Sequence, residues 1–269
     1  MPEGQAIVTG MMTALAGLGA ILTALTLVWV LSVKLQDASI ADVCWGSGFV
    51  LLAWLYCLLS PRLTPRSWLV ATLITLWGAR LSQHIFRRNR HKGEDPRYQA
   101  MRTSHGRAFW WRSLFTVFWL QGAILWFVAL PVLVAVRAAR PEELTAVDGL
   151  GLVLFMIGFS FEVVGDYQLA RFKAEPSNRG HVLDRGLWRY TRHPNYFGDA
   201  TLWWGVYAIA GATPGGWLTV LSPALMTLLL MRVSGVTLLE DGLKASKPGY
   251  RAYITRTPAF FPWFPRVPR

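Results

Sequence analysis

The residues best suited to chemistry lie in the stretch 188–199, which reads Trp-Arg-Tyr-Thr-Arg-His-Pro-Asn-Tyr-Phe-Gly-Asp. Pro194 suits the first turn of a helix. Asn195 and Tyr196 would then lie near a helix N-terminus, where free N–H groups favour anions. Asp199 follows one turn later inside an apolar segment, and an ionisable residue at that depth indicates a functional site. The stretch therefore predicts a polar ligand held where water meets the bilayer.

A second polar group lies at the end of the preceding apolar segment. Asp166 is followed one and two helical turns later by the cations Arg171 and Lys173. This order of charges suits the helix dipole, which is an ordinary structural role. Alternatively, Asp166 accepts hydrogen bonds from ribose or amide groups while the two cations bind phosphate. The pattern leaves both interpretations open.

Loops and the tail supply further candidates. Residues 176–186 are small and polar, and can expose backbone N–H groups in tight turns. No G-x-G-x-x-G fingerprint follows a strand here, so a nucleotide would be bound by a helical fold. Glu240 and Asp241 could simply end an apolar helix, and Arg256 could bind lipid headgroups. The tail, rich in proline and aromatic residues, predicts a cap folded back on the cytoplasmic face.

The first half of the chain offers a separate polar group. Gln36, Asp37 and Asp42 lie near the start of an apolar segment, and Arg80 lies within the next one. A buried Asp42 must find a partner or stay protonated. Arg80 is the expected partner in a purely structural interpretation. A pocket that polarises a substrate oxygen is the functional alternative.

The segments that must position these residues are typical of a membrane protein. The 269 residues are 53% hydrophobic and only 16% charged, unlike a soluble domain. Windows of about 20 residues that are almost free of charge predict transmembrane helices. We expect one all-α, polytopic membrane domain over residues 1–269. Its seven expected transmembrane helices cover residues 7–33, 39–60, 67–86, 110–136, 147–168, 197–213 and 216–235.

The basic residues predict the orientation. The net charge is +12, and of the 27 Lys and Arg, eight lie in 87–112, six in 169–196 and seven in 232–269. With seven spans these segments share one side, which the positive-inside rule makes cytoplasmic. The N-terminus is then outside and the C-terminus cytoplasmic. The basic loops serve either topology and anionic lipids or a polyanionic ligand; a nucleic acid is not an expected partner.

The spacing of cysteine and histidine residues argues against a disulfide and against a metal site. Cys44 and Cys57 lie in one expected helix, about 20 Å apart, which is too far for a disulfide. Metal-ligand spacings of Cys and His, and Glu-x-x-His pairs, are missing from the sequence. No metal site is expected.

These patterns together resemble the steroid 5-alpha-reductase family, in particular its bacterial membrane members. The resemblance rests on the stretch 188–199, on Asp166-Tyr167, on Glu240-Asp241, on Tyr250-x-x-Tyr253-x-x-x-Thr257 and on Lys-Gly-Glu-Asp-Pro-Arg-Tyr98. It covers most of the chain from about Asp37 and is strongest from residue 150 onward. The sterol C14- and C7-reductases share a similar Arg-His-Pro-Asn-Tyr stretch and aromatic tail.

The resemblance implies an NADPH-dependent reductase of a conjugated enone. Asn195, Tyr196 and Asp199 match residues that hold the cofactor in the family. Glu240 and Tyr253 resemble the acid and the tyrosine that close the cofactor pocket. The expected cofactor-binding residues are Asp166, Arg171, Lys173, Asn178, His181, Trp188, Arg192, His193, Asn195, Tyr196, Asp199, Glu240, Tyr250, Tyr253 and Arg256.

The resemblance is weaker for the catalytic residues. The family uses a Gln-Glu pair near the start of span two and a tyrosine in span three. The nearest pair here is Gln36-Asp37. The expected third span contains no tyrosine; its available groups are Trp77, Arg80 and His84, and Tyr98 lies in the following loop. We expect Gln36, Asp37, Asp42 and Tyr98 at the catalytic end. Asp37 or Asp42 would stabilise the enolate that forms when hydride reaches the β-carbon.

The rest of the expected biology follows from the same resemblance. The substrate is a lipophilic enone, a steroid or another, that enters from the bilayer. Residues 1–110 would form the substrate side, and residues 111–269 the cofactor side with its C-terminal cap. We expect a monomer in a bacterial inner membrane, in contact with membrane lipids, with its NADPH site facing the cytoplasm.

Two other functions are compatible with the pattern. Isoprenylcysteine carboxyl methyltransferases, which use S-adenosylmethionine, have a similar Arg-His-Pro stretch and a paired acid before an aromatic tail. A transporter or lipid-binding membrane protein would use the polar residues as a pathway and need no cofactor. The nucleotide that stabilises the purified protein against heat separates the three hypotheses.

Overall fold

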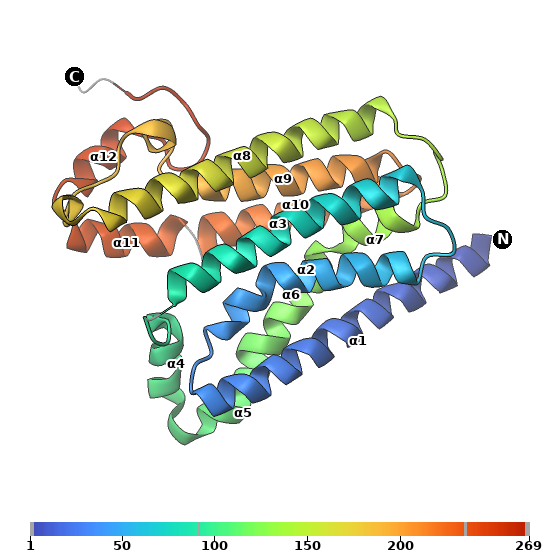
Figure 1. Ribbon diagram of the computed structural model, residues 1–269, viewed down its shortest axis with the longest axis horizontal. Helices are drawn as coiled ribbons and strands as arrows, with labels where there is room; N and C mark the ends of the chain where they lie inside the picture. The colour runs from blue at the N-terminus through green and yellow to red at the C-terminus, as the bar shows by residue number, and fades with distance from the viewer. Residues whose placement is uncertain (1–2, 91, 234–235, 267–269) are drawn as a thin grey trace. The chain divides into compact units, whose positions relative to one another are not determined.

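A computed structural model of the chain describes residues 3–90, 92–233 and 236–266. Within these ranges all regular secondary structure is helical, which confirms the predicted all-α fold class (Figure 1). The chain divides into two compact units. The first unit comprises Met1–Thr145 and Ala210–Trp217, and the second comprises Ala146–Ile209 and Leu218–Arg269.

The first unit is built from long helices followed by shorter ones. Its helices are α1 (Glu3–Leu35), α2 (Ile40–Leu58), α3 (Pro65–Asn89), α4 (Pro96–His105), α5 (Phe109–Ser113), a π-helical segment (Leu114–Trp119), α6 (Leu120–Val128) and α7 (Leu130–Arg137). Figure 1 shows α2 and α3 running along each other within this unit. They approach so closely that a side chain on Gly46 or Gly78 would collide with the opposite backbone. Fully buried Phe49 and Trp77 pack edge to face, 5.3 Å apart, at this contact.

Local sequence explains where two of these helices begin. Thr64 caps α3 by accepting a hydrogen bond from the Ser67 amide, in a reciprocal capping box, and Pro65 opens the first turn. Asp95 caps α4 in the same manner, and Pro96 opens it. Tyr98 therefore lies on a helix and not in the loop expected from the sequence.

The loops of the first unit gather at two ends. At one end Arg62 pairs with Glu142 at 2.9 Å, and Arg66 donates to the carbonyl of Pro141 at 2.8 Å. At the other end the amide of Ala38 donates to Glu94 at 2.9 Å. These bonds join segments that are far apart in the sequence and fix the ends of the helices between them.

The second unit is dominated by one long helix. Its elements are α8 (Ala146–Ala174), short 3-10 turns (Pro176–Asn178 and Gly186–Arg189), α9 (Pro194–Gly211), α10 (Leu221–Leu228), a π-helical segment (Leu229–Val233), α11 (Val236–Ser246) and α12 (Tyr250–Arg256). Helix α9 begins at Pro194, as its position in the sequence predicted. Helix α8 has Asp148 in its first turn and two cations in its last, which suits the helix dipole.

Glycines let α8 and α9 lie in backbone contact. A side chain on Gly158 would collide with the backbone of Gly198 and Leu202, and one on Gly205 would lie 2.6 Å from the carbonyl of Gly151. Small residues at such contacts are the usual way for helices to associate within a membrane. Figure 1 shows the two helices side by side. The close approach brings the N-terminus of α9 against α8, where Asp166 lies.

Four helical segments among the described residues are long and apolar enough to cross a membrane. They are Ile7–Leu35, Ile40–Leu58, Pro96–Val128 and Ala146–Ala174, with a shorter apolar helix over Gly216–Arg232. An integral membrane protein is therefore supported, whereas the count of seven spans and the outside N-terminus stay predictions. The expected span 110–136 is interrupted: α6 ends at Val128 and α7 starts anew with Pro131 in its first turn. Cys44 and Cys57 are free thiols, as expected.

Candidate active site

A carboxylate–tyrosine pair, Asp42 and Tyr98, forms the most reactive-looking group of the first unit. The hydroxyl of Tyr98 donates to Asp42 Oδ1 at 2.6 Å, and the tyrosine is 5% exposed. The other carboxylate oxygen of Asp42 accepts from Arg97 at 2.7 Å. Gln121 donates to the Tyr98 hydroxyl at 3.0 Å. Both the carboxylate and the phenol are thus oriented by fixed donors.

Three elements position this pair. Asp42 comes from the first turn of α2, and Tyr98 from the first turn of α4. Gln121 lies at the start of α6, directly after the π-helical segment Leu114–Trp119. A π-helical turn contains an extra residue and changes which side chains face inward, and such turns recur at functional sites. Here the π-helical segment directly precedes the first turn of α6, from which the side-chain amide of Gln121 reaches Tyr98.

An ion pair anchors the segment that carries Tyr98. Glu94 accepts two hydrogen bonds from Arg102, at 2.8 and 2.9 Å, and a third from the amide of Ala38. Burial raises the pKa of Glu94, but these donors lower it by more, so the carboxylate is favoured. The amide of Asp95 also donates to Ser39 at 2.7 Å. The start of α4 is therefore tied to the loop before α2.

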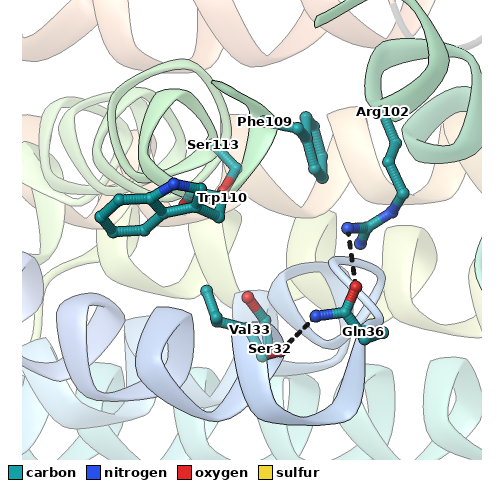
Figure 2. A pocket seen from close by; sticks show the side chains of 7 residues that line it. All are labelled: Ser32, Val33, Gln36, Arg102, Phe109, Trp110 and Ser113. Carbon is teal, nitrogen blue, oxygen red and sulfur yellow. Dashed lines mark hydrogen bonds between the residues drawn. The ribbon is translucent and has the colours of Figure 1, made fainter. Parts of the chain in front are cut away.

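Gln36 lies beside a small cavity of about 10 Å³ (Figure 2). Its side chain donates to the carbonyl of Val33 at 2.7 Å and accepts from Arg102 at 3.4 Å. Its φ of +54° is unusual for a residue with a side chain and ends α1 in the left-handed region. The cavity has room for about one water molecule, so it is no steroid pocket.

The four predicted catalytic residues thus have different hydrogen-bond partners. Asp42 and Tyr98 bond directly to each other, whereas Gln36 bonds with Arg102, and Asp37 accepts from the amide of Ser39 at 2.8 Å. The Asp37 bond is a local turn contact at the start of α2. Their catalytic roles stay predictions, but direct bonding favours Asp42 over Asp37 as the carboxylate that orients Tyr98.

Sequence reasoning missed two partners of the pair, Arg97 and Gln121. It expected Arg80 beside Asp42, whereas in the structure Asp42 forms its ion pair with Arg97 at 2.7 Å. Gln121 could have been noticed, because a polar amide inside an apolar segment is uncommon and marks a functional candidate. Arg97 carried no such signal, since it looked like one more loop cation.

In the second unit, Arg192, His193 and Glu240 form a buried cluster, here named the Arg192 cluster. Arg192 donates to both carboxylate oxygens of Glu240, at 2.8 and 3.2 Å, and His193 lies 3.1 Å from the same carboxylate. The remaining Arg192 donors reach the carbonyls of Thr257 and Ile254. The cluster therefore fastens α9 to α11 and to the end of α12.

The tail folds back along this cluster; its predicted place on the cytoplasmic face stays a prediction. The amide of Arg192 donates to Pro258 at 2.9 Å, and the amide of Trp263 donates to Tyr190 at 2.9 Å. Thr191 donates to the carbonyl of Phe260 at 2.8 Å. Such backbone pairing replaces a further membrane span with a short extended cover.

Electrostatics keep the cluster charged. Burial raises the pKa of Glu240, but the hydrogen bonds from His193 and Arg192 lower it by more, to about 2. Burial, followed by the nearby Glu240 charge, raises the pKa of Tyr250 to about 12. Tyr250 is thus a neutral hydrogen-bonding group beside a fixed carboxylate over the whole physiological range.

A second contact of the second unit joins two residues expected to hold a cofactor. The amide of Asn195 donates to Asp166 at 3.0 Å, and Asp166 is 7% exposed. Tyr196 stacks in parallel on His193, with ring centroids 5.5 Å apart. The start of α9 and the adjoining turn of α8 therefore present an amide, an aromatic face and a carboxylate together, a set that can bind a carboxamide or a ribose.

Some of the remaining predicted cofactor residues form hydrogen bonds within the protein, and others are exposed. Trp188 donates to the carbonyl of Gly165 at 3.1 Å, Tyr253 donates to the carbonyl of Trp188, and Asn178 donates to the carbonyl of Phe172 at 2.9 Å. These bonds fix the loop before α9. The exposed or partly exposed ones are Arg171, Lys173, His181 and Arg256, and Asp199 is 9% exposed on α9.

Comparisons with known proteins identify the family. The family described as "Protein of unknown function (DUF1295)" matches residues 28–257. An uncharacterized protein of Schizosaccharomyces pombe is 27% identical over 262 residues, which cover 87% of this chain and 75% of the yeast protein. No solved structure matches the chain. The chain belongs to the DUF1295 family, which is a steroid 5-alpha-reductase-like family.

Proposed function

We propose that the protein reduces the C=C bond of a lipophilic conjugated enone with NADPH, on the cytoplasmic side of a bacterial inner membrane. The observation that carries this proposal is the 2.6 Å hydrogen bond between the buried phenol of Tyr98 and the half-buried carboxylate of Asp42. A phenol held by a carboxylate suits the polarisation of a ketone oxygen. The family likeness to steroid 5-alpha-reductases agrees with this role.

The hydrogen-bond directions define what the pair must do. The single proton of the Tyr98 hydroxyl is donated to Asp42, and Gln121 donates to the phenol oxygen. To bind a ketone oxygen, Tyr98 must turn its proton from Asp42 toward the substrate. Arg97 continues to hold Asp42 during that turn. As the enolate develops, its oxygen gains negative charge and the hydrogen bond from Tyr98 strengthens.

The second unit supplies residues that fit NADPH. Asn195 and Asp166 offer an amide and a carboxylate 3.0 Å apart, and Tyr196 offers an aromatic face. Exposed Arg171 and Lys173 suit phosphate groups. When bound, the cofactor would supply the hydride, and water would replace the proton consumed at the α-carbon. The protein residues bind, orient and exclude solvent.

Ligand-dependent thermal stability of the detergent-purified protein tests the cofactor. NADPH should raise the unfolding midpoint, because a ligand at 100 times its dissociation constant adds about 2.7 kcal/mol. S-adenosylmethionine should have no effect; stabilisation by it alone would favour the methyltransferase hypothesis. Stabilisation by neither would favour a cofactor-free transporter or lipid-binding protein.

The Asp42→Asn variant tests the chemistry. It should keep the NADPH-dependent rise in the midpoint but lose enone reduction by about 100-fold, in line with the loss of one oriented polar group. NADPH oxidation over a panel of apolar enones is the measurement. Full activity of Asp42→Asn would contradict the assigned role while leaving the cofactor assignment intact.

A further inference from the structure

A second cavity, of about 360 Å³, lies on the second unit and is lined by charged residues, of which Arg256 alone was also expected to bind the cofactor. We name it the arginine cavity; its lining residues are Asp184, Arg185, Gly186, Arg189, Arg256, Thr257 and Pro265. Three arginines and one aspartate give it a formal charge of +2. Arg256 and Asp184 meet at 3.4 Å across a partly exposed contact. Arg185 and Arg189 are exposed, and neither forms an ion pair with a carboxylate in the described part of the chain.

The wall of the arginine cavity is attached to a helix that can cross a membrane. Two hydrogen bonds fix the turn Gly186–Arg189 to α8. The amide of Leu187 donates to the side chain of Gln168 at 3.0 Å, and the indole of Trp188 donates to the carbonyl of Gly165 at 3.1 Å. The candidate span ends at Ala174, so these anchors lie within about 14 Å of its end. With Ala146–Ala174 as a membrane span, Arg185 and Arg189 would therefore lie near the lipid headgroups.

Exposed aromatic side chains continue the surface beyond the cavity. Phe261, Trp263 and Phe264 are 69%, 71% and 73% exposed. Phe264 contacts Tyr190 edge to face at 6.1 Å and precedes Pro265 of the cavity wall. Exposed aromatics beside arginines are typical of the membrane–water interface, where rings enter the acyl boundary and cations meet phosphates.

We propose that the arginine cavity binds the phosphate of an anionic phospholipid, with Trp263 and Phe264 inserted among the acyl chains beside it. The proposal is independent of the reductase function. The size of the arginine cavity suits a lipid headgroup. The cavity's charge of +2 complements a phosphodiester and the negative surface of a cytoplasmic leaflet. Bound lipid would hold the tail, and through it the cap over the Arg192 cluster.

The test measures the thermal midpoint of the detergent-purified protein during titration with short-chain phosphatidylglycerol or phosphatidylcholine. Phosphatidylglycerol should raise the midpoint and phosphatidylcholine should not. The double variant R185Q/R189Q should need about 30-fold more phosphatidylglycerol for half of the rise, from about 1 kcal/mol per arginine. The control Arg251→Gln changes an exposed arginine of α12 outside the cavity and should behave like the unchanged protein.

Two further titrations distinguish a lipid phosphate from a soluble phosphate compound as the ligand of the arginine cavity. Inorganic phosphate and NADPH at matched ionic strength should give no rise that depends on Arg185 and Arg189. If either gives such a rise, the cavity binds a soluble phosphate compound and the lipid proposal is wrong. Equal effects of both lipids, or an unchanged titration of R185Q/R189Q, would also overturn it. Trp263→Ser should weaken the lipid response while leaving the NADPH response unchanged.

Discussion

At the scale of single residues, the protein uses charged groups in two distinct ways. The Arg192 cluster holds a buried carboxylate by three donors and fastens the tail. The carboxylate–tyrosine pair instead leaves a phenol whose proton can be turned toward another acceptor. The fixed cluster suits a stabilising contact, whereas the redirectable donor suits the proposed chemistry.

Gln121 is expected to be a positioning residue for Tyr98. Its amide donates to the phenol oxygen at 3.0 Å. Gln121→Leu keeps similar volume but removes the donor, so kcat for enone reduction should fall about tenfold while the dissociation constant of NADPH stays unchanged. Gln5→Leu, at an exposed glutamine of α1, is the control and should keep full kcat. A rise in KM at constant kcat would contradict the positioning role.

Glu240 should make stability depend on acidity. Its pKa falls from 4.5 to about 2 in the folded protein, so its contribution is complete above pH 4.5 and is lost as pH drops toward 2. Glu240→Gln should lower the free energy of unfolding at neutral pH by about 2 kcal/mol, because Arg192 loses its buried counter-charge. Thermal midpoints measured from neutral to acidic pH check this.

The matched control for Glu240 is Glu175→Gln, since Glu175 is exposed in the loop after α8. This variant should follow the unchanged protein over the whole pH range. The Glu240→Gln curve should be flatter than both between pH 4.5 and 2. Three parallel curves would show that the Arg192 cluster does not set the acid limit.

At the scale of helices, glycine spacing determines how α8 meets α9. A methyl group on Gly158 would collide with the backbone of α9, and backbone atoms cannot move aside as a flexible side chain can. Gly158→Ala should therefore destabilise the protein by about 3 kcal/mol. Gly149→Ala lies on the same helix, where a methyl group meets nothing within 4 Å, and should be neutral or slightly stabilising. Equal midpoints of the two variants would refute the close contact.

The helices were more predictable than the partners of their side chains. The expected segment 147–168 corresponds to α8 over Ala146–Ala174, because apolar length and terminal charges are local signals. The Asp95-Pro96 pair is a local signal for the start of the helix that carries Tyr98. The many basic residues around it nevertheless favoured a loop in the sequence analysis. The bond from Gln121 to Tyr98 could not be predicted, since a π-helical turn and tertiary contact create it.

At the scale of the whole molecule, the bonds between loops agree with the expected order of the membrane crossings. The loops holding Arg62 and Glu142 meet at one end of the first unit. The loops holding Ala38 and Glu94 meet at its other end. With an outside N-terminus, the first two loops are outer and the second two are cytoplasmic, so each contact joins loops of one side. The bonds group the loops by side, and the basic residues predict which of the two sides is cytoplasmic.

Single-cysteine labelling in intact bacterial cells tests that choice. Cys44→Ser and Cys57→Ala remove the native thiols, and Glu142→Cys and Arg179→Cys each place one thiol in an exposed loop. Glu142 makes only a surface ion pair with Arg62, which contributes at most about 1 kcal/mol, so its replacement should leave the fold intact. A membrane-impermeant maleimide should label Glu142→Cys in intact cells and Arg179→Cys only after permeabilisation. The reverse pattern would place the Arg192 cluster and the arginine cavity outside the cell, away from NADPH, and would reject both the topology and the proposed reductase.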